Sequence, residues 1–371
     1  MARTKKQDEY GLSKPTPTRK MAVPDLPYKP KDPQHYHPPI GLIGCGGITE
    51  QHLRAYRGAG YNVVALCDKV EERAQKRKAD FYPDAEVYTD FGALLRRPDI
   101  EVVDIATHPA ERGPIIHAAL EAGKHVLSQK PFVTNLGFGL ELADLADRKG
   151  LKLAVNQNGR WSPHFSYIRQ AINGGLVGDV LGAHLGVCWD HNWIINTEFN
   201  KVHHVVLYDF AIHWFDIVTQ FFGERQPQRV FASLAQSSNQ TAAPPLLGQA
   251  LIEYEGGQAS LTFDAATPFG HQDFTYVAGS AGTIKSVGPN LGEQQVTLYT
   301  ENGYCSPALE GSWFPAGFHG TMAELLCSIE EDRQPSNNAR ANLASLALCF
   351  AAVASAEDDQ PKVPGEVREM R

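Results

Sequence analysis

The sequence of 371 residues lacks the features that mark several specialised classes of protein. It has no run of 18 apolar residues, so we expect no membrane-spanning helix. Its N-terminus has no apolar core like that of a secretion signal. The six cysteines are widely scattered and form no Cys-x-x-Cys pair, which predicts reduced thiols in a cytoplasmic protein rather than a disulfide framework.

A large excess of basic residues is missing as well. Lys and Arg together number 34 against 42 Asp and Glu, which gives a net charge of −8. This balance argues against nucleic acid as the main partner. What the sequence does have is a hydrophobic share of 43%, enough for a sizeable core, and a length that predicts two domains.

Residues 1–38 differ in composition from the rest of the chain. They carry eight Lys or Arg but only four Asp or Glu, and prolines recur along them. Such a segment cannot fold alone and favours extended, polyproline-like conformations. Two interpretations stay open: a disordered tail, or an arm that lies on a neighbouring subunit and is anchored by Tyr28 and Tyr36.

Apolar strands alternate with helical patterns over residues 39–160. This order predicts a doubly wound domain, in which helices cover both faces of a parallel sheet and ligands bind at the carboxyl ends of the strands. Strands are expected at 40–46, 62–68, 102–107, 125–131 and 151–158, and helices at 49–59, 70–80, 114–124 and 137–149.

A glycine-rich turn, GLIGCGGIT, joins the first of these strands to the first helix. Gly44, Gly46 and Gly47, followed by Ile48, place bare backbone at a helix N-terminus. There the amide groups can bind a pyrophosphate, whose approach a Cβ would block. The match to Gly-x-Gly-x-x-Gly is incomplete, because Thr49 occupies the last position.

Asp68 ends the second strand, where a carboxylate can accept hydrogen bonds from the adenosine ribose of a dinucleotide. The same carboxylate would repel a 2′-phosphate, so NAD is favoured over NADP, although Lys69 weakens this preference. The alternative is that the glycines form only a tight turn and that Asp68 only caps the following helix.

Hairpin signals dominate the second half of the chain. Residues 181–189 alternate like a strand, and pairs of strands are expected around Gly256–Gly257 and around the GSAG turn at 279–282. Such hairpins imply antiparallel neighbours. Helices are expected at 318–332 and 340–358, and the second of these should pack back near the first domain.

The stretches GLIGCGGI, ALCD, VVDIAT, HVLSQKP, VNQNGRW and YDFAIHWFD, in this order, resemble a known family. It is the glucose–fructose oxidoreductase/inositol dehydrogenase/rhizopine-catabolism family of nicotinamide-dependent sugar and cyclitol dehydrogenases, and the resemblance runs from residue 39 to about 365. It implies a Rossmann domain, followed over residues 161–371 by an α/β domain with a large, mostly antiparallel open sheet. It also implies a homodimer or homotetramer that binds NAD, or less readily NADP, and a small sugar, sugar acid or cyclitol.

Three catalytic candidates follow from the resemblance. Lys130 matches the lysine of the family's Glu-Lys-Pro motif, and Asp209 and His213 match a later Asp and His whose i, i+4 spacing puts them on one helix face. Oxidation of a carbinol releases a proton, which His213 would accept with a pKa of about 6 to 8 while Lys130 stabilises the alkoxide. In other family members the lysine is the base, so the two roles can exchange.

Further residues are expected around the cofactor and the substrate. Thr107, His108 and Gln129 lie at strand ends on the cofactor side, and Gln129, which replaces the family's glutamate, can still bind the nicotinamide ribose through its amide. Asn158 and Arg160 are expected to contact sugar hydroxyls. The alternative for Arg160 is an ion pair with a carboxylate between the domains.

Asp190 and His191, in the aromatic-rich stretch CWDHNWI, are expected to line a rim that contacts the substrate. His203 and His204 follow nearby, but their spacing is not a recognised ligand pattern, so no metal is predicted. The stretch 312–320 is expected to be a similar loop.

Two functions remain open. The first is an NAD-dependent dehydrogenase that oxidises a CH–OH group. The second is a relative with tightly bound NAD that assists glycoside cleavage or epimerisation through transient oxidation. Net release of NADH would support the first, and stoichiometric bound NAD the second. A regulatory protein without chemistry ranks last, because Lys130 and His213 are both present.

Overall fold

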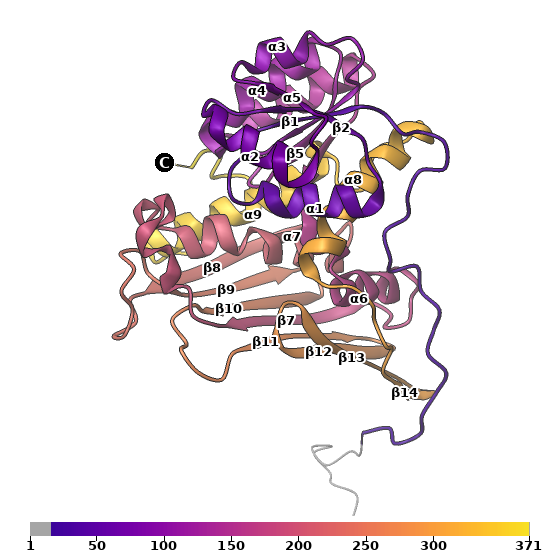
Figure 1. Cartoon of the computed structure of the whole chain (residues 1–371). Helices are drawn as coiled ribbons and strands as arrows, with labels where there is room; N and C mark the ends of the chain where they lie inside the picture. Colours follow the sequence, from indigo (N-terminus) through magenta and orange to yellow (C-terminus); the bar gives the residue numbers. More distant parts are fainter. Residues whose placement is uncertain (1–15, 371) are drawn as a thin grey trace, which may run out of the picture.

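The computed structural model describes residues 16–370, which form two units built around one β-sheet each (Figure 1). The N-terminal sheet is parallel throughout and has the strand order β3-β2-β1-β4-β5-β6. The order reverses between β1 and β4, so the carboxyl ends of these strands form the crevice where such sheets bind ligands. The strands are β1 (Ile40–Ile43), β2 (Val63–Cys67), β3 (Glu86–Tyr88), β4 (Val102–Ile105), β5 (His125–Gln129) and β6 (Leu153–Asn156).

The expected alternation of strands and helices is confirmed in this unit. Successive residues of β1 enter different apolar clusters, with Leu42 in one and Ile43 in the other, because helices cover both faces of the sheet. Two short elements, β3 and α3, were not expected, since they are too short to show a period. The helices are α1 (Thr49–Ala59), α2 (Glu71–Phe81), α3 (Phe91–Leu95), α4 (Pro109–Glu121) and α5 (Leu136–Arg148).

The second sheet is mostly antiparallel, as expected, with the order β14-β13-β12-β11-β7-β10-β9-β8 and one parallel pair, β7 with β10. One face is covered by α6 (Pro163–Asn173), α7 (Ile212–Phe222) and a later helix, and no described helix covers the other face (Figure 1). The strands are β7 (Val180–Cys188), β8 (Pro227–Ala235), β9 (Leu247–Tyr254), β10 (Gly257–Asp264), β11 (Gln272–Gly279), β12 (Gly282–Asn290), β13 (Glu293–Thr300) and β14 (Gly303–Cys305).

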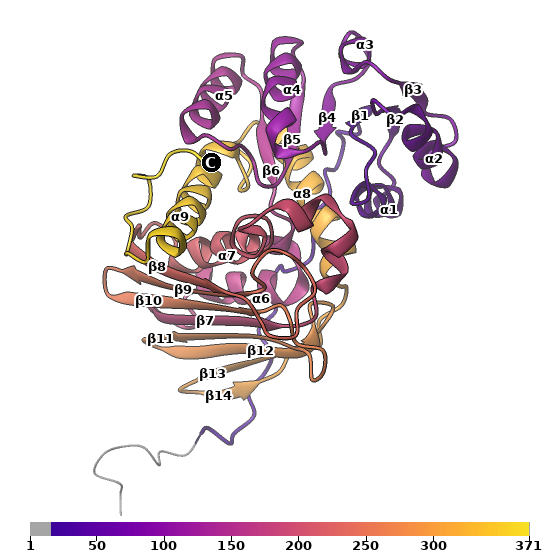
Figure 2. The same cartoon turned by 90° about the vertical axis from the view of Figure 1, so that its left-hand side faces the viewer.

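The last two helices return to the first unit (Figure 2). α8 (Trp313–Glu330) packs against α1, and α9 (Ala339–Asp358) packs against α5 as well as α7 and β8. The stretch 312–320, expected to be a loop, is therefore almost entirely helical. α9 is long and apolar enough to cross a membrane, but 67% of its most apolar window is buried in the fold, as in a core helix.

Residues 16–38 form an extended arm along their own chain (Figure 1). The Tyr28 ring lies 6.1 Å from the ring of Tyr167 on α6, and the Tyr36 hydroxyl donates a hydrogen bond to Glu101. Both expected anchors therefore make contacts within their own chain. Residues 1–15 lie outside the described residues.

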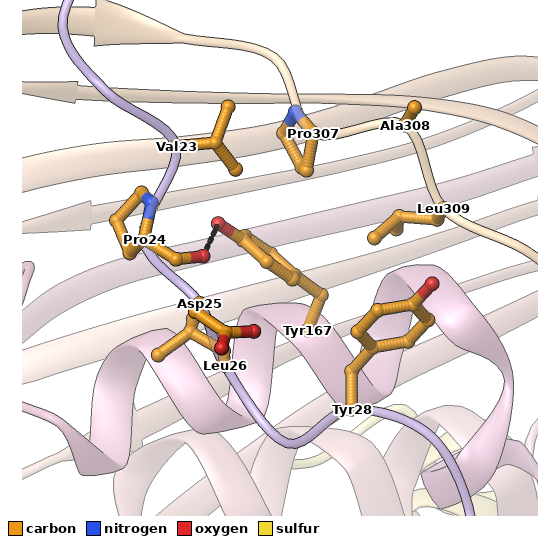
Figure 3. Close-up of a pocket in the computed structure, with 9 residues that line it drawn as sticks. All are labelled: Val23, Pro24, Asp25, Leu26, Tyr28, Tyr167, Pro307, Ala308 and Leu309. Carbon is orange, nitrogen blue, oxygen red and sulfur yellow. Dashed lines mark hydrogen bonds between the residues drawn. The ribbon is translucent and has the colours of Figure 1, made fainter.

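The arm leaves a cavity of about 230 Å³ between itself and residues 307–309 (Figure 3). The Tyr167 hydroxyl donates to the Pro24 carbonyl oxygen at its wall. Further along, Asp32 of the arm accepts hydrogen bonds from the Tyr61 hydroxyl and from His319 on α8. The arm therefore ties the second unit to the first.

Candidate active site

The glycine turn leaves its backbone open where α1 begins. Gly44 has φ +94°, and a Cβ there would lie 2.9 Å from the backbone of Ala106, so another residue would be strained and crowded. A Cβ on Gly46 or Gly47 would meet no described protein atom within 4 Å. Ile48 precedes α1 without a side-chain capping bond, so its side chain does not occupy the N-terminal end of the helix, where an anion can bind. These features fit a dinucleotide pyrophosphate.

Asp68 follows β2 and reaches back to the glycine turn. Its Oδ2 accepts from the Cys45 amide at 2.7 Å and its Oδ1 from the Val70 amide at 2.9 Å. The carboxylate thus stabilises the turn and the start of α2, as the alternative interpretation expected. Each oxygen can accept a further hydrogen bond, so ribose hydroxyls can still bind. The Lys69 ammonium points to Glu111 instead, at 2.7 Å.

Lys130 and Asp209 meet where the two units face each other. Lys130 follows β5, and its Nζ donates to the Asp209 carbonyl oxygen at 2.8 Å and lies 3.3 Å from Oδ1. Asp209 lies in a π-helical turn, Val206–Phe210, and His213 lies in the first turn of α7. The single helix expected here is therefore divided by a π turn, a rare element that is frequent at functional sites.

Burial and the nearby Lys130 charge hold the pKa of His213 well below its usual value of 6.5. The ring packs edge-on against Trp313 at 5.5 Å, and Nδ1 is buried without a hydrogen-bond partner in the described part of the chain. The titration near pH 6 to 8 expected from the sequence is therefore wrong for this state, because an apolar environment and a neighbouring cation both disfavour the imidazolium.

Arg112 supports Lys130 and was not expected from the sequence. This buried residue of α4 donates to the carbonyl oxygens of Gln129, at 2.7 Å, and of Pro131, which flank the lysine on either side. It also donates to the Thr107 carbonyl at the end of β4. An arginine in a helix gives no local signal of this role, because the three carbonyls come together only in the folded sheet.

Gln129 faces a buried histidine rather than the cleft. Its Oε1 accepts from the Lys130 amide at 2.6 Å, and its Nε2 donates to Nε2 of His52 at 3.0 Å. The His52 Nδ1 lies 2.7 Å from Asp104, which also accepts from the Tyr56 hydroxyl. This network places the His52 proton on Nδ1. Both ends of the Gln129 amide are engaged, which disfavours the expected bond to the nicotinamide ribose.

Thr107 and His108 follow β4 beside the glycine turn. A Cβ on Gly44 would lie 3.0 Å from the Thr107 amide nitrogen, and His108 immediately precedes α4. Asn158 lies in the short η1 helix, Asn158–Trp161, that joins the units. The Thr107 hydroxyl and the Asn158 Oδ1 are both buried without a partner among the described residues, as expected of groups that a polar ligand or water would satisfy.

Arg160 does not reach the site, and its expected contact with sugar hydroxyls is wrong. Its side chain is fully buried, and its Nε and Nη2 each lie 2.6 Å from a carboxylate oxygen of Asp216 on α7. Its Nη1 donates to the Ser336 carbonyl at 2.7 Å. The η1 helix turns this side chain into the protein, so the alternative, an ion pair between the units, is what forms.

Asp190 and His191 have different surroundings. The charges of Lys130 and Asp209 both act on His191, and burial lowers its pKa to about 4. Asp190 is exposed, and its Oδ1 accepts from the Asn192 amide at 3.0 Å, so it stabilises its own turn. Among the described residues, no three or more His, Cys, Asp or Glu are grouped to hold a metal.

Comparison with known proteins agrees with this geometry. Residues 39–157 match a family described as oxidoreductases with an NAD-binding Rossmann fold, and residues 165–285 match the GFO/IDH/MocA C-terminal domain. The chain belongs to this GFO/IDH/MocA family of oxidoreductases. The resemblance seen in the sequence is thereby confirmed, as is the fold class.

Individual relatives are distant but cover most of the chain. D-apiose dehydrogenase of Paraburkholderia graminis is 24% identical, over 85% of this chain and 87% of its own. Inositol 2-dehydrogenase of Rhizobium meliloti is 25% identical, over 85% and 96%. An Agrobacterium radiobacter oxidoreductase in complex with NAD⁺, L-tartaric acid and magnesium has the same fold, with a TM-score of 0.77 at 18% identity over 89% of this chain and 99% of that one.

Proposed function

We propose that this oxidoreductase is an NAD-dependent dehydrogenase that oxidises a CH–OH group of a sugar, sugar acid or cyclitol. The observation that carries the proposal is the meeting of Lys130 and Asp209, with His213 electrostatically coupled to the lysine, at the carboxyl end of β5. Two relatives whose names state a sugar and a cyclitol as substrates support this substrate class.

The three side chains can divide the work of activating a carbinol. Bound NAD would supply the hydride acceptor. His213, kept neutral by burial and by the Lys130 charge, can accept a hydrogen bond from the carbinol hydroxyl. Lys130 stabilises the negative charge that develops on the carbinol oxygen. Asp209 holds the Lys130 ammonium and can bind a neighbouring hydroxyl. Both residues stay candidates for the base, because the burial and the Lys130 charge that keep His213 neutral also disfavour the imidazolium that accepting the proton would form.

The cofactor would lie between the glycine turn and Lys130. NAD is favoured over NADP, because the Asp68 carboxylate would repel a 2′-phosphate, and Lys69 is drawn away from it toward Glu111. The residues that would hold or face the cofactor are Gly44, Gly46, Gly47, Ile48, Asp68, Thr107, His108 and Lys130.

A polyhydroxylated substrate fits the polar atoms around the cluster. Four buried atoms on flanking segments have no partner among the described residues: Asn158 Oδ1, His213 Nδ1, the Tyr208 hydroxyl and Trp189 Nε1. An apolar substrate would leave them unsatisfied at a cost of about 1–3 kcal/mol each. His191, stacked on Trp189 at 5.6 Å, completes this side. Tyr208 was not expected from the sequence, because nothing in its local pattern marks it.

The bare face of the second sheet supports a homodimer or homotetramer. Phe231 and Leu251 are directly paired on this face and are 41% and 58% exposed, and Tyr276 and Val287 are each 43% exposed. Exposed apolar side chains on one sheet face suit burial against a second copy. All six cysteines are unpaired, which supports a cytoplasmic location.

The test is turnover with NAD and a panel of pentoses, hexoses, sugar acids and inositols, followed by absorbance at 340 nm. We expect net NADH release with at least one polyol and none with simple aliphatic alcohols. If the purified protein instead retains stoichiometric NAD and converts a glycoside or an epimer without net NADH, the second function, transient oxidation by a bound cofactor, replaces the first.

A further inference from the structure

The incomplete glycine motif has a structural counterpart in Thr49. This residue, which stands where the motif has its last glycine, is fully buried. Its hydroxyl donates to the Gly46 carbonyl oxygen at 2.6 Å and accepts from Nε of Arg77 on α2 at 3.2 Å. A glycine at position 49 would supply neither bond. The departure from the motif is therefore coupled to an arginine on the next helix.

Arg77 occupies a position where an apolar residue is expected. It lies on the buried face of α2 with Ala74 and Phe81, and its side chain is 7% exposed. A buried guanidinium is unfavourable unless its donors are bonded. Its Nη2 donates to the carbonyl oxygens of Gly46, at 2.9 Å, and Gly47, at 3.2 Å. The arginine thus binds two successive carbonyl oxygens of the glycine turn.

Because the peptide bond is planar, this contact also sets the direction of the neighbouring amides. In a trans peptide the carbonyl of one residue points opposite to the amide of the next. Because Arg77 holds the carbonyls of Gly46 and Gly47, the amides of Gly47 and Ile48 are turned to the other side. A Cβ on Gly47 would meet no described atom within 4 Å, so the space beside the turn at this residue is open.

Within the described residues, Arg77 is also the one basic side chain that donates hydrogen bonds to the turn and to Thr49. Its charge is partly balanced by Glu50, whose Oε2 lies 3.4 Å from Nη1. Glu50 is 42% exposed, and its other oxygen is bound by Arg54 at 3.0 Å. Solvent therefore screens the Glu50 carboxylate more than it screens the buried guanidinium.

We propose that Arg77, through Thr49, is a cofactor-positioning residue that orients the turn's amides toward the pyrophosphate and adds a buried positive charge beneath it. The proposal depends on the NAD-binding domain that the family match establishes and not on the identity of the sugar. In the complete motif, the third glycine allows the helix to pack closely against the strand. Here the Arg77 side chain, from the second helix, stabilises the turn instead.

The experiment compares the binding of ADP-ribose and of adenosine to the full-length protein, each by competition with NADH fluorescence. Both ligands contain the adenosine ribose, but only ADP-ribose carries the pyrophosphate. For Arg77→Met we expect ADP-ribose to bind at least tenfold more weakly and adenosine within about twofold of the parent. The control, Lys76→Met, removes an exposed charge from the same helix and should change neither affinity.

A second variant keeps the proposal testable if Arg77→Met does not fold. Thr49→Val removes only the hydroxyl between Arg77 and Gly46, and we expect ADP-ribose binding to weaken about threefold with adenosine unchanged. An ADP-ribose affinity within twofold of the parent in the folded variants overturns the proposal. So does an equal loss for both ligands, which would show that Arg77 only maintains the domain. Neither readout requires a sugar substrate, so failure of the proposed dehydrogenase reaction remains distinguishable.

Discussion

The glycine turn and the Lys130 cluster lie at the same crevice but are built in opposite ways. The turn acts through backbone: Gly44 requires φ +94°, and a Cβ at Gly46 would enter the open side. The cluster acts through side chains that come from both units, with 79 positions between Lys130 and Asp209. Cofactor binding at the turn should therefore be sensitive to added side-chain atoms. The cluster should be sensitive to the loss of charges and to the loss of the buried ion pair that aligns the two units.

The largest effect is expected from a change in the buried ion pair of Arg160 and Asp216. Arg160→Met would leave Asp216 of α7 as a buried carboxylate without its ion-pair partner, which should lower the free energy of unfolding by about 3–5 kcal/mol. Arg340→Met is the control, since this half-exposed arginine pairs with Asp144 and Asp147 at the surface and should contribute about 0–1 kcal/mol. Urea unfolding measures both. A loss below 1 kcal/mol for Arg160→Met would show that the ion pair is not structural and would make Arg160 a candidate ligand contact again.

The catalytic side chain comes next. Lys130→Met keeps the length of the side chain but removes the charge that stabilises the alkoxide, so kcat should fall on the order of 10²-fold or more. NADH affinity should stay within about threefold, because the glycine turn and Asp68 are untouched. Lys149→Met, which removes a surface ion pair with Glu121, is the control. Turnover within threefold of the parent would remove Lys130 from the chemistry.

The turn is tested by an added methyl group. A Cβ on Gly46 meets no protein atom, so Gly46→Ala should keep the melting temperature of the ligand-free protein and weaken NAD about tenfold. Gly58→Ala is the control, because this glycine of α1 is also unobstructed. NAD binding by NADH displacement gives the answer. Equal NAD affinity in both variants would mean that the pyrophosphate does not approach Gly46.

Asp68→Ala should have a smaller and more specific effect. Loss of the carboxylate removes hydrogen bonds to the ribose and the repulsion of a 2′-phosphate, so we expect KM for NAD to rise about fivefold and the preference over NADP to narrow. Because Asp68 also accepts from the Cys45 amide, some of the loss comes from the turn itself. Asp90→Ala, at the start of α3, removes a comparable cap away from the crevice. An unchanged ratio of the two KM values would place Asp68 in the turn alone.

The sequence predicted the turn better than the cluster, for a physical reason. Strand, glycines and helix are adjacent in the chain, and a period of 2 or 3.6 residues distinguishes strand from helix. The expected helix at 49–59 agrees with α1 at both ends. The contact of Arg77 with Gly46, by contrast, joins α2 to the glycine turn and leaves no local pattern, and neither does the contact of Arg112 with Gln129.

Burial limited the prediction of the remaining site residues. Arg160 and Asn158 lie two positions apart after β6, and the sequence could not show that one reaches Asp216 while the other keeps an unpartnered oxygen. The same limit applies to His213, whose type alone indicates a pKa near 6.5. Its surroundings come from Lys130 and Trp313, 83 and 100 positions away, and they change that value.

The smallest expected effect is the pH dependence of the parent enzyme. The pKa of His213 lies well below 6.5, so the imidazole is neutral, and able to accept a proton, at every pH above that lowered value. The sign follows: kcat for oxidation should be lost only as pH falls through the lowered pKa, and it should vary by less than about twofold between pH 6.5 and 8. A pH–rate profile with saturating NAD and substrate measures this. An acidic limb centred between pH 6 and 8 that disappears in His213→Asn would contradict the prediction. It would show that ligand binding returns the pKa of His213 to its usual range. The residues of the cluster, and not the protein that surrounds them, would then determine its chemistry.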